Sequence, residues 1–239
     1  MVADDAILFN ETNRLGAVLW AKTLGTEGLN NDPKMVSCVL YKRLWGHHRG
    51  YALLYNGGLV VESDTLLRSS IEAAICLCAN FHTDGGLWIQ LKQDALHTVT
   101  AQIKQAREID DKELERDGEK ARRWLAAQME PGLGARKLEM KDLADDGGVP
   151  MLYQFYRGLS GTSSHVTGLS IMRGVVSPNE PAMQEAWADL TKRTHHLWQI
   201  AAMLQGSFCH ALLLNDEELA DTTLGLAKRL QLRLDVAGL

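Results

Sequence analysis

The segment LLRSSIEAAICLC, residues 66–78, decides the fold class of this chain. Its apolar residues recur at the spacing of one helix face, and other apolar residues fill most of the remaining circumference. A helix that is apolar nearly all round belongs at the centre of a bundle. Arg68 and Glu72 interrupt this frame, and because they are four residues apart they share a helix face. The segment therefore predicts a central helix with a partly buried ion pair.

Helical patterns continue outward from this segment, and no convincing strand alternation or fixed-period repeat appears. Glycine pairs at 57–58, 85–86 and 147–148 mark loops between these patterns. A chain of 239 residues is long enough to bury a sizeable core. We expect an all-α bundle of six to eight helices that forms a single domain over residues 1–239.

Caps and prolines place the expected helix boundaries. Asp32 before Pro33 is a typical helix start, and Asn215 and Glu218 have the spacing of a capping box. Residues 131–150 are rich in glycine, proline and mixed charges, which predicts a loop or mobile excursion. The sequence predicts helices over about 4–24, 33–55, from 63 or 64, 89–129, from 151, 182–214 and after 215.

Composition limits the class of protein. The net charge of −5 gives no global attraction to nucleic acid or to anionic lipid. No stretch approaches the ~20 apolar residues of a membrane span, and the N-terminus lacks the pattern of a signal peptide. The cysteines lack metal-finger spacing, so they are expected to be reduced core residues. We expect a cytoplasmic protein with no membrane partner. These cysteines are Cys38, Cys76, Cys78 and Cys209.

The segment YQFYRGLSGTSSH, residues 153–165, places a second set of polar groups in a small-residue frame. Tyr156 and Arg157 lie one turn before Ser160, and the hydroxyl residues that follow weaken the helix. His165 stands at the expected bend. Such a bend could hold an anion or a polar head group. The alternative is a tight helix crossing in which His165 donates to a backbone carbonyl.

The ion pair of Arg68 and Glu72 has two interpretations. It could be purely structural, or it could bear a ligand, because a guanidinium needs more acceptors than one carboxylate supplies. We expect the two segments to form a polar pocket that binds a small polar or anionic ligand, or a segment of a partner protein. The residues of this pocket would be Arg68, Glu72, Tyr156, Arg157, Ser160 and His165.

An Arg-Ser-x-x-Glu-Ala helix at residues 68–73, followed by Tyr-Arg-x-Leu-Ser and a histidine at residues 156–165, resembles a family of uncharacterised bacterial all-helical proteins. The resemblance covers mainly residues 62–80 and 151–170, and it implies a site shared between these two segments. The family has no established activity. Its helices are similar to those of HEPN-type domains, many of which are metal-independent ribonucleases of toxin–antitoxin and anti-phage systems.

A HEPN-like endoribonuclease is therefore the first alternative function, and the only one with a nucleic acid as partner. Its Arg would stabilise developing negative charge, and its His would act as acid or base. HEPN ribonucleases separate these residues by four to six positions, whereas Arg157 and His165 are separated by seven. Arg43 and His48 fit by count, but Leu44 stands where a polar residue is expected.

No metal or cofactor is expected. His195 and His196 are adjacent and so diverge on a helix, and no pair of metal ligands has helical spacing. A glycine-rich phosphate loop is also missing from the sequence. The second alternative is an interaction protein that forms a homodimer through its helices, with six tryptophans as anchors. Whether the protein is an enzyme stays open at this point.

Overall fold

Helices make up most of the chain, and the described residues contain no strand. The structure is a computed structural model that describes residues 3–27, 33–162 and 181–237. Nine helices occur in these ranges, slightly more than the six to eight predicted, and the all-α class is confirmed. They are α1 (Ala3–Leu24), α2 (Pro33–Asn56), α3 (Val60–His82), α4 (Gly86–Glu108), α5 (Lys112–Ala127), α6 (Met140–Asp146), α7 (Pro150–Thr162), α9 (Pro181–Leu213) and α10 (Glu217–Ala237).

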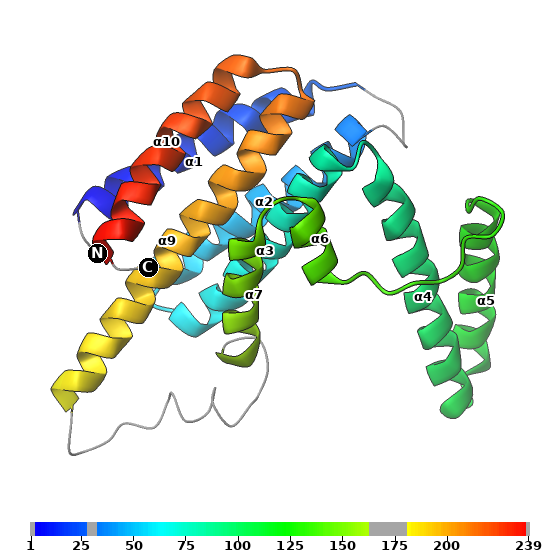
Figure 1. The fold of residues 1–239 in the computed structure, drawn as a ribbon. Coiled ribbons are helices and arrows are strands. Elements are labelled where there is room, and N and C mark those ends of the chain that lie inside the picture. The colour runs from blue at the N-terminus through cyan, green and yellow to red at the C-terminus, as the bar shows by residue number, and fades with distance from the viewer. Residues whose placement is uncertain (1–2, 28–32, 163–180, 238–239) are drawn as a thin grey trace.

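Helix α3 lies at the centre of the bundle, as its apolar sequence predicts (Figure 1). Helices α2 and α9 pack along it, and α6 and α7 cover more of its surface. Ile71, Ile75 and Cys78 are buried at helical spacing along α3. One hydrophobic cluster joins α3 to α1, α2, α6, α7, α9 and α10, so the bundle has a single core and forms one domain. All four cysteines are buried in the core, as predicted, and none of them forms a disulfide.

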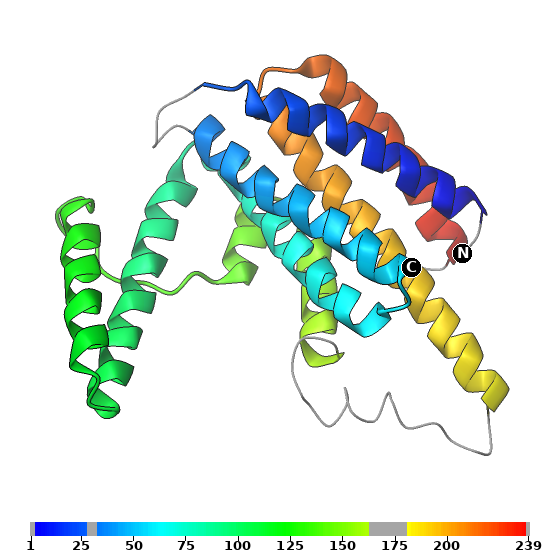
Figure 2. The ribbon, with the colours of Figure 1, turned by 180° about the vertical axis from the view of Figure 1, so that it is seen from behind.

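Helices α4 and α5 form a hairpin that projects from the bundle (Figures 1 and 2). The prediction of one long helix over 89–129 is therefore wrong. The chain turns at Asp110, which has a left-handed backbone with a φ of 56°. Asp111 then caps α5, because its carboxylate accepts the backbone N–H groups of Glu113 and Leu114 at 3.1 and 2.9 Å.

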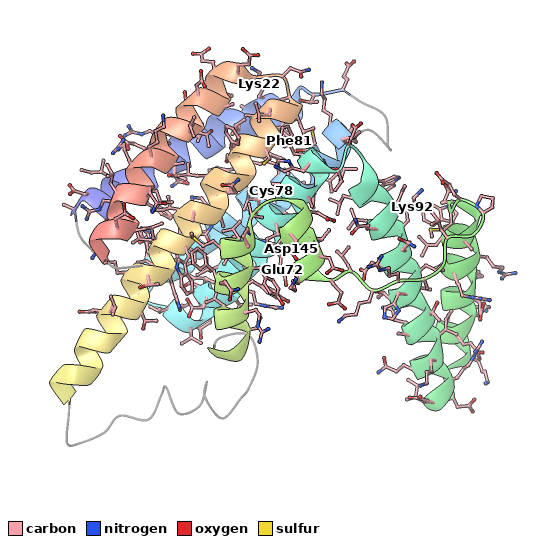
Figure 3. All side chains as sticks on the ribbon, in the orientation of Figure 1. Lys22, Glu72, Cys78, Phe81, Lys92 and Asp145 are labelled. Atoms are coloured by element: carbon pink, nitrogen blue, oxygen red, sulfur yellow. The ribbon has the colours of Figure 1, made fainter. Side chains whose placement is uncertain are left out.

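The chain from α5 back to the bundle crosses α4. The side-chain amide of Gln93 donates to the carbonyl of Gly134 at 3.1 Å, and the N–H of Arg136 donates to the carbonyl of Gln93 at 3.2 Å. Lys92, labelled in Figure 3, donates to a carbonyl at the end of α5 at 3.0 Å. Helix α6 follows within residues 131–150, which were predicted to be a loop throughout. This crossing segment forms one wall of the site described below.

Two predicted helix starts need correction. Helix α3 begins at Val60 rather than at residue 63 or 64. The cap of α10 is Asp216, whose carboxylate accepts the N–H of Leu219 at 3.1 Å. Asn215 was predicted to be the cap, but its φ of 57° is left-handed, and an N-cap normally has an extended backbone. The predicted start of α2 at Pro33 is confirmed.

We expect Gly147→Ala to lower the free energy of unfolding by about 1–3 kcal/mol, because the new methyl group would overpack the contact between α6 and α3. A Cβ at this position would lie 2.9 Å from the backbone nitrogen of Ala79 and 2.9 Å from Cβ of Cys78. Urea unfolding measures the loss. Gly225→Ala on α10 is the control, because nothing lies within 4 Å of its Cβ and helix propensity favours alanine. Equal stability of the two variants would contradict the prediction.

Candidate functional site

Arg68 joins the two predicted segments. Its guanidinium forms an ion pair with Glu72, with Nη2 3.1 Å from Oε1, and donates hydrogen bonds to the hydroxyl of Tyr156 at 2.7 Å and to Ser160 Oγ at 3.1 Å. Its Cζ atom lies 4.6 Å from the centre of the Tyr156 ring, a cation–π contact. The structure thus brings together four of the six residues predicted for the pocket, and Arg68 has acceptors beyond the single carboxylate.

Helical spacing explains this arrangement. Arg68 and Glu72 are one turn apart on α3, and Tyr156 and Ser160 are one turn apart on α7. The Ser160 hydroxyl also donates to the carbonyl of Tyr156 at 2.8 Å, which orients it within α7. Leu159 is fully buried and holds α7 against the core. Both helices therefore present a polar stripe to the same junction.

The other predicted site residues do not join this junction. Arg157 is exposed on α7, outside the contacts that Arg68 makes. His165 lies outside the described residues. Arg43 is exposed on α2, whereas His48 on the same helix is fully buried. Desolvation lowers the pKa of His48 to about 3, and its ring stacks on a phenylalanine of α1 at 4.8 Å. His48 is therefore enclosed in the core and is not accessible to a substrate beside Arg43.

A cleft of about 320 Å³ opens beside Glu72 and Tyr156. Asp94 on α4 and Tyr153 on α7 line it, together with residues 137–141 of the segment that crosses α4. Glu72, labelled in Figure 3, lies beside α7. The backbone N–H of Leu138 donates to Asp94 Oδ1 at 2.8 Å and fixes this wall to α4. The cleft thus combines groups from α3, α4 and α7 with the crossing segment.

Most charged side chains that line the cleft have an ion-pair partner, but one carboxylate has none in the described part of the chain. Glu72 pairs with Arg68 at 3.1 Å, and Lys137 pairs with Glu139 at 3.2 Å. Lys141 pairs at 2.7 Å with Asp145 of α6, which is labelled in Figure 3. Asp94 accepts one backbone N–H, but it has no cationic partner among the described residues. The cleft therefore retains one carboxylate whose charge the protein does not compensate.

Sequence reasoning missed Asp94, Tyr153 and the wall at residues 137–141. Tyr153 carried a usable signal, because it lies one turn before Tyr156 on the same helix, and the two rings stack with centroids 6.1 Å apart. Asp94 carried none. It meets residues 137–141 only because the α4–α5 hairpin folds back, and no local pattern reports that contact.

A second polar arrangement lies between α3 and α9. His195 donates through Nδ1 to Asp64 at 2.7 Å, and both side chains are buried. The neighbouring His196 faces away and stacks on Phe9 at 4.5 Å, so the two histidines diverge as predicted. Within the residues that the structure describes, no group of three or more potential ligands could hold a metal ion. No helix in the same ranges is long and apolar enough to cross a membrane.

No protein-family model matches this chain, and comparison with curated proteins and with solved structures found no significant similarity. The resemblance to the bacterial helical family and to HEPN-type domains therefore stays a prediction.

Proposed function

We propose that this protein binds a small polar molecule with a protonated amino group in the cleft between α3, α4 and α7. The observation that carries the proposal is the uncompensated carboxylate of Asp94, which lines the same cleft as Glu72. A charged group in a cleft is favourable only when a counter-charge or hydrogen bonds accompany it. A ligand ammonium group would supply both to Asp94.

The other lining groups suit such a ligand. Tyr153 and Tyr156 present aromatic rings and hydroxyl groups on one wall, and aromatic faces attract cations. Lys137 and Lys141 also line the cleft and would meet a carboxylate or hydroxyl elsewhere on the ligand. The volume of about 320 Å³ is at the small end of the range for ligand pockets, about 300–1,000 Å³.

Arg68 acts in this proposal as a positioning residue. It is only 21% exposed, it pairs with Glu72, and it donates hydrogen bonds to Tyr156 and Ser160. The guanidinium thereby holds the Glu72 carboxylate and the Tyr156 ring in place before a ligand arrives. Such preorganisation raises affinity because less conformational entropy is lost on binding. We further propose a cytoplasmic location, which is supported by four buried cysteines that form no disulfide.

We expect 1,4-diaminobutane and 4-aminobutyrate to raise the melting temperature of the protein, whereas succinate, which has no amino group, leaves it unchanged. Asp94→Asn should weaken the binding of both amines by about tenfold or more, since a charged hydrogen bond contributes about 1.5–3 kcal/mol. Thermal-shift assays and isothermal titration calorimetry measure the two effects.

Asp221→Asn is the matched control. Asp221 is exposed on α10, so this substitution removes the same charge far from the cleft. Affinity for the amines should stay within about twofold of the unmodified protein in this variant. Stabilisation by succinate, or unchanged amine binding in Asp94→Asn, would show that the cleft does not select for an amino group.

A further inference from the structure

A groove of about 690 Å³ lies between α1 and α2. Figure 2 shows these helices side by side on the face toward the viewer. Its polar lining consists of two arginines and three asparagines, and its apolar lining of two alanines, a tryptophan and a leucine. These residues are Asn10, Asn13, Arg14 and Ala17 on α1, and Trp45, Arg49, Ala52, Leu53 and Asn56 on α2.

The charge of the groove is opposite to that of the whole chain. The protein carries a net charge of −5, yet no carboxylate from the described residues lines the groove. Arg14 and Arg49 are exposed, and neither has an ion-pair partner within the described part of the chain. Glu11 on α1 is engaged elsewhere, by Arg229 of α10. The groove therefore presents two uncompensated guanidinium groups.

Each helix of the groove supplies one of these guanidinium groups, Arg14 from α1 and Arg49 from α2. The helices run in opposite directions, with Gly16 against Trp45 and the ring of Phe9 4.8 Å from that of His48. Each guanidinium group can hold a carboxylate in bidentate geometry, so the groove suits a segment that carries at least two carboxylates.

A purely ionic ligand would fit the groove less well than a ligand that also has an apolar surface, because part of the lining is apolar. Leu53 is 74% exposed, and a bound phosphate or citrate would leave it and Ala52 uncovered. Along α2 the groove extends from Trp45 to Asn56, about 16 Å or three helical turns. A long polyanion such as RNA would meet the acidic remainder of the surface, whereas a short acidic segment meets only the groove.

We propose that this groove binds an acidic amphipathic helix of a partner protein. The helix lays its apolar face over Leu53, Ala52 and Ala17, and its carboxylates pair with Arg14 and Arg49. This groove shares no lining residue with the cleft between α3, α4 and α7. The proposal of a helical partner is therefore independent of the proposal of an amine ligand.

The probe is a fluorescein-labelled, amidated peptide with two copies of the heptad Glu-Leu-Ala-Glu-Glu-Leu-Ala, measured by fluorescence anisotropy. The matched control peptide carries lysine in place of every glutamate. We expect the acidic peptide to bind and the basic peptide not to bind. The double variant Arg14→Glu/Arg49→Glu should bind the acidic peptide at least about tenfold more weakly, about 1.4 kcal/mol.

Arg123→Glu is the control for charge, because Arg123 is exposed on α5, far from the groove. It should bind the acidic peptide within about twofold of the unmodified protein. Far-ultraviolet circular dichroism should show intact helices in all variants, since each altered arginine is exposed. No binding of the acidic peptide at about 1 mM, equal binding of both peptides, or displacement of the acidic peptide by a 12-nucleotide RNA at lower concentration than by unlabelled peptide would overturn the proposal.

Discussion

At pH 5 the protein is expected to be about 6 kcal/mol less stable toward unfolding than at pH 7.5, because three buried histidines are neutral in the folded state. Desolvation lowers the pKa of His48 to about 3, that of His196 to about 4 and that of His210 to about 3. Each unfolded histidine has a pKa of about 6.5 and gains a proton on acidification, so each favours unfolding by about 2 kcal/mol at pH 5.

The sign follows from proton binding. Between about pH 6.5 and pH 4 the unfolded chain binds more protons than the folded chain, so acid stabilises the unfolded state. The contribution of these histidines to stability is fully present above pH 6.5 and is lost as the pH falls. A loss of about 6 kcal/mol is comparable to the whole stability of a typical domain, so urea unfolding at pH 5 should have a much lower midpoint than at pH 7.5.

His196→Phe tests the cause. Neither ring nitrogen of His196 has a hydrogen-bond partner, and its ring stacks on Phe9 at 4.5 Å, so a phenyl ring keeps the packing and removes the titrating group. The stability difference between pH 7.5 and pH 5 should shrink by about 2 kcal/mol. His97→Gln, at an exposed position on α4, should leave the difference as it is. If both variants kept the full pH dependence, buried histidines would not be its source.

The burial of His48 was readable from the sequence, although the count of residues between Arg43 and His48 suggested a catalytic pair. Tyr41, Leu44 and Trp45 are buried. His48 follows them by seven, four and three residues respectively, so it lies on the same helix face. A histidine on an apolar stripe is expected in the core. Its neighbour His47, turned by about 100° on the helix, is only half-buried.

Local spacing predicted the parts of the site but not the complete site. The pair of Arg68 and Glu72 follows from i,i+4 geometry, and so does the stripe that carries Tyr156 and Ser160. Polar groups within apolar helices need polar partners, and the stripes on α3 and α7 supply these partners to each other. Asp94 could not be predicted, because its place in the cleft depends on a turn near Asp110 within a charged run that reads equally well as continuous helix.

Asp5→Asn is expected to lower the free energy of unfolding by about 3–5 kcal/mol, because Asp5 is the only carboxylate in the described chain that meets two guanidinium groups while being fully buried. Its Oδ2 accepts from Arg193 Nε of α9 at 2.9 Å, and its Oδ1 accepts from Arg233 Nε of α10 at 2.7 Å. These bonds join α1 to both helices. Neutralising Asp5 removes the carboxylate that pairs with Arg193 and leaves Arg233 with only the exposed Asp4 as a counter-charge.

The neighbouring Asp4 provides the control within the same turn of α1. It is 69% exposed and pairs with Arg233 at 3.1 Å, so Asp4→Asn should reduce the free energy of unfolding by less than about 1 kcal/mol. Urea unfolding at pH 7.5 compares the two variants, and hydrogen exchange should show faster opening of α10 in Asp5→Asn alone. Equal losses from the two substitutions would mean that the ion pairs act as surface charges. A large loss confined to Asp5→Asn would instead locate the attachment of α1 and α10 to the bundle at this buried carboxylate.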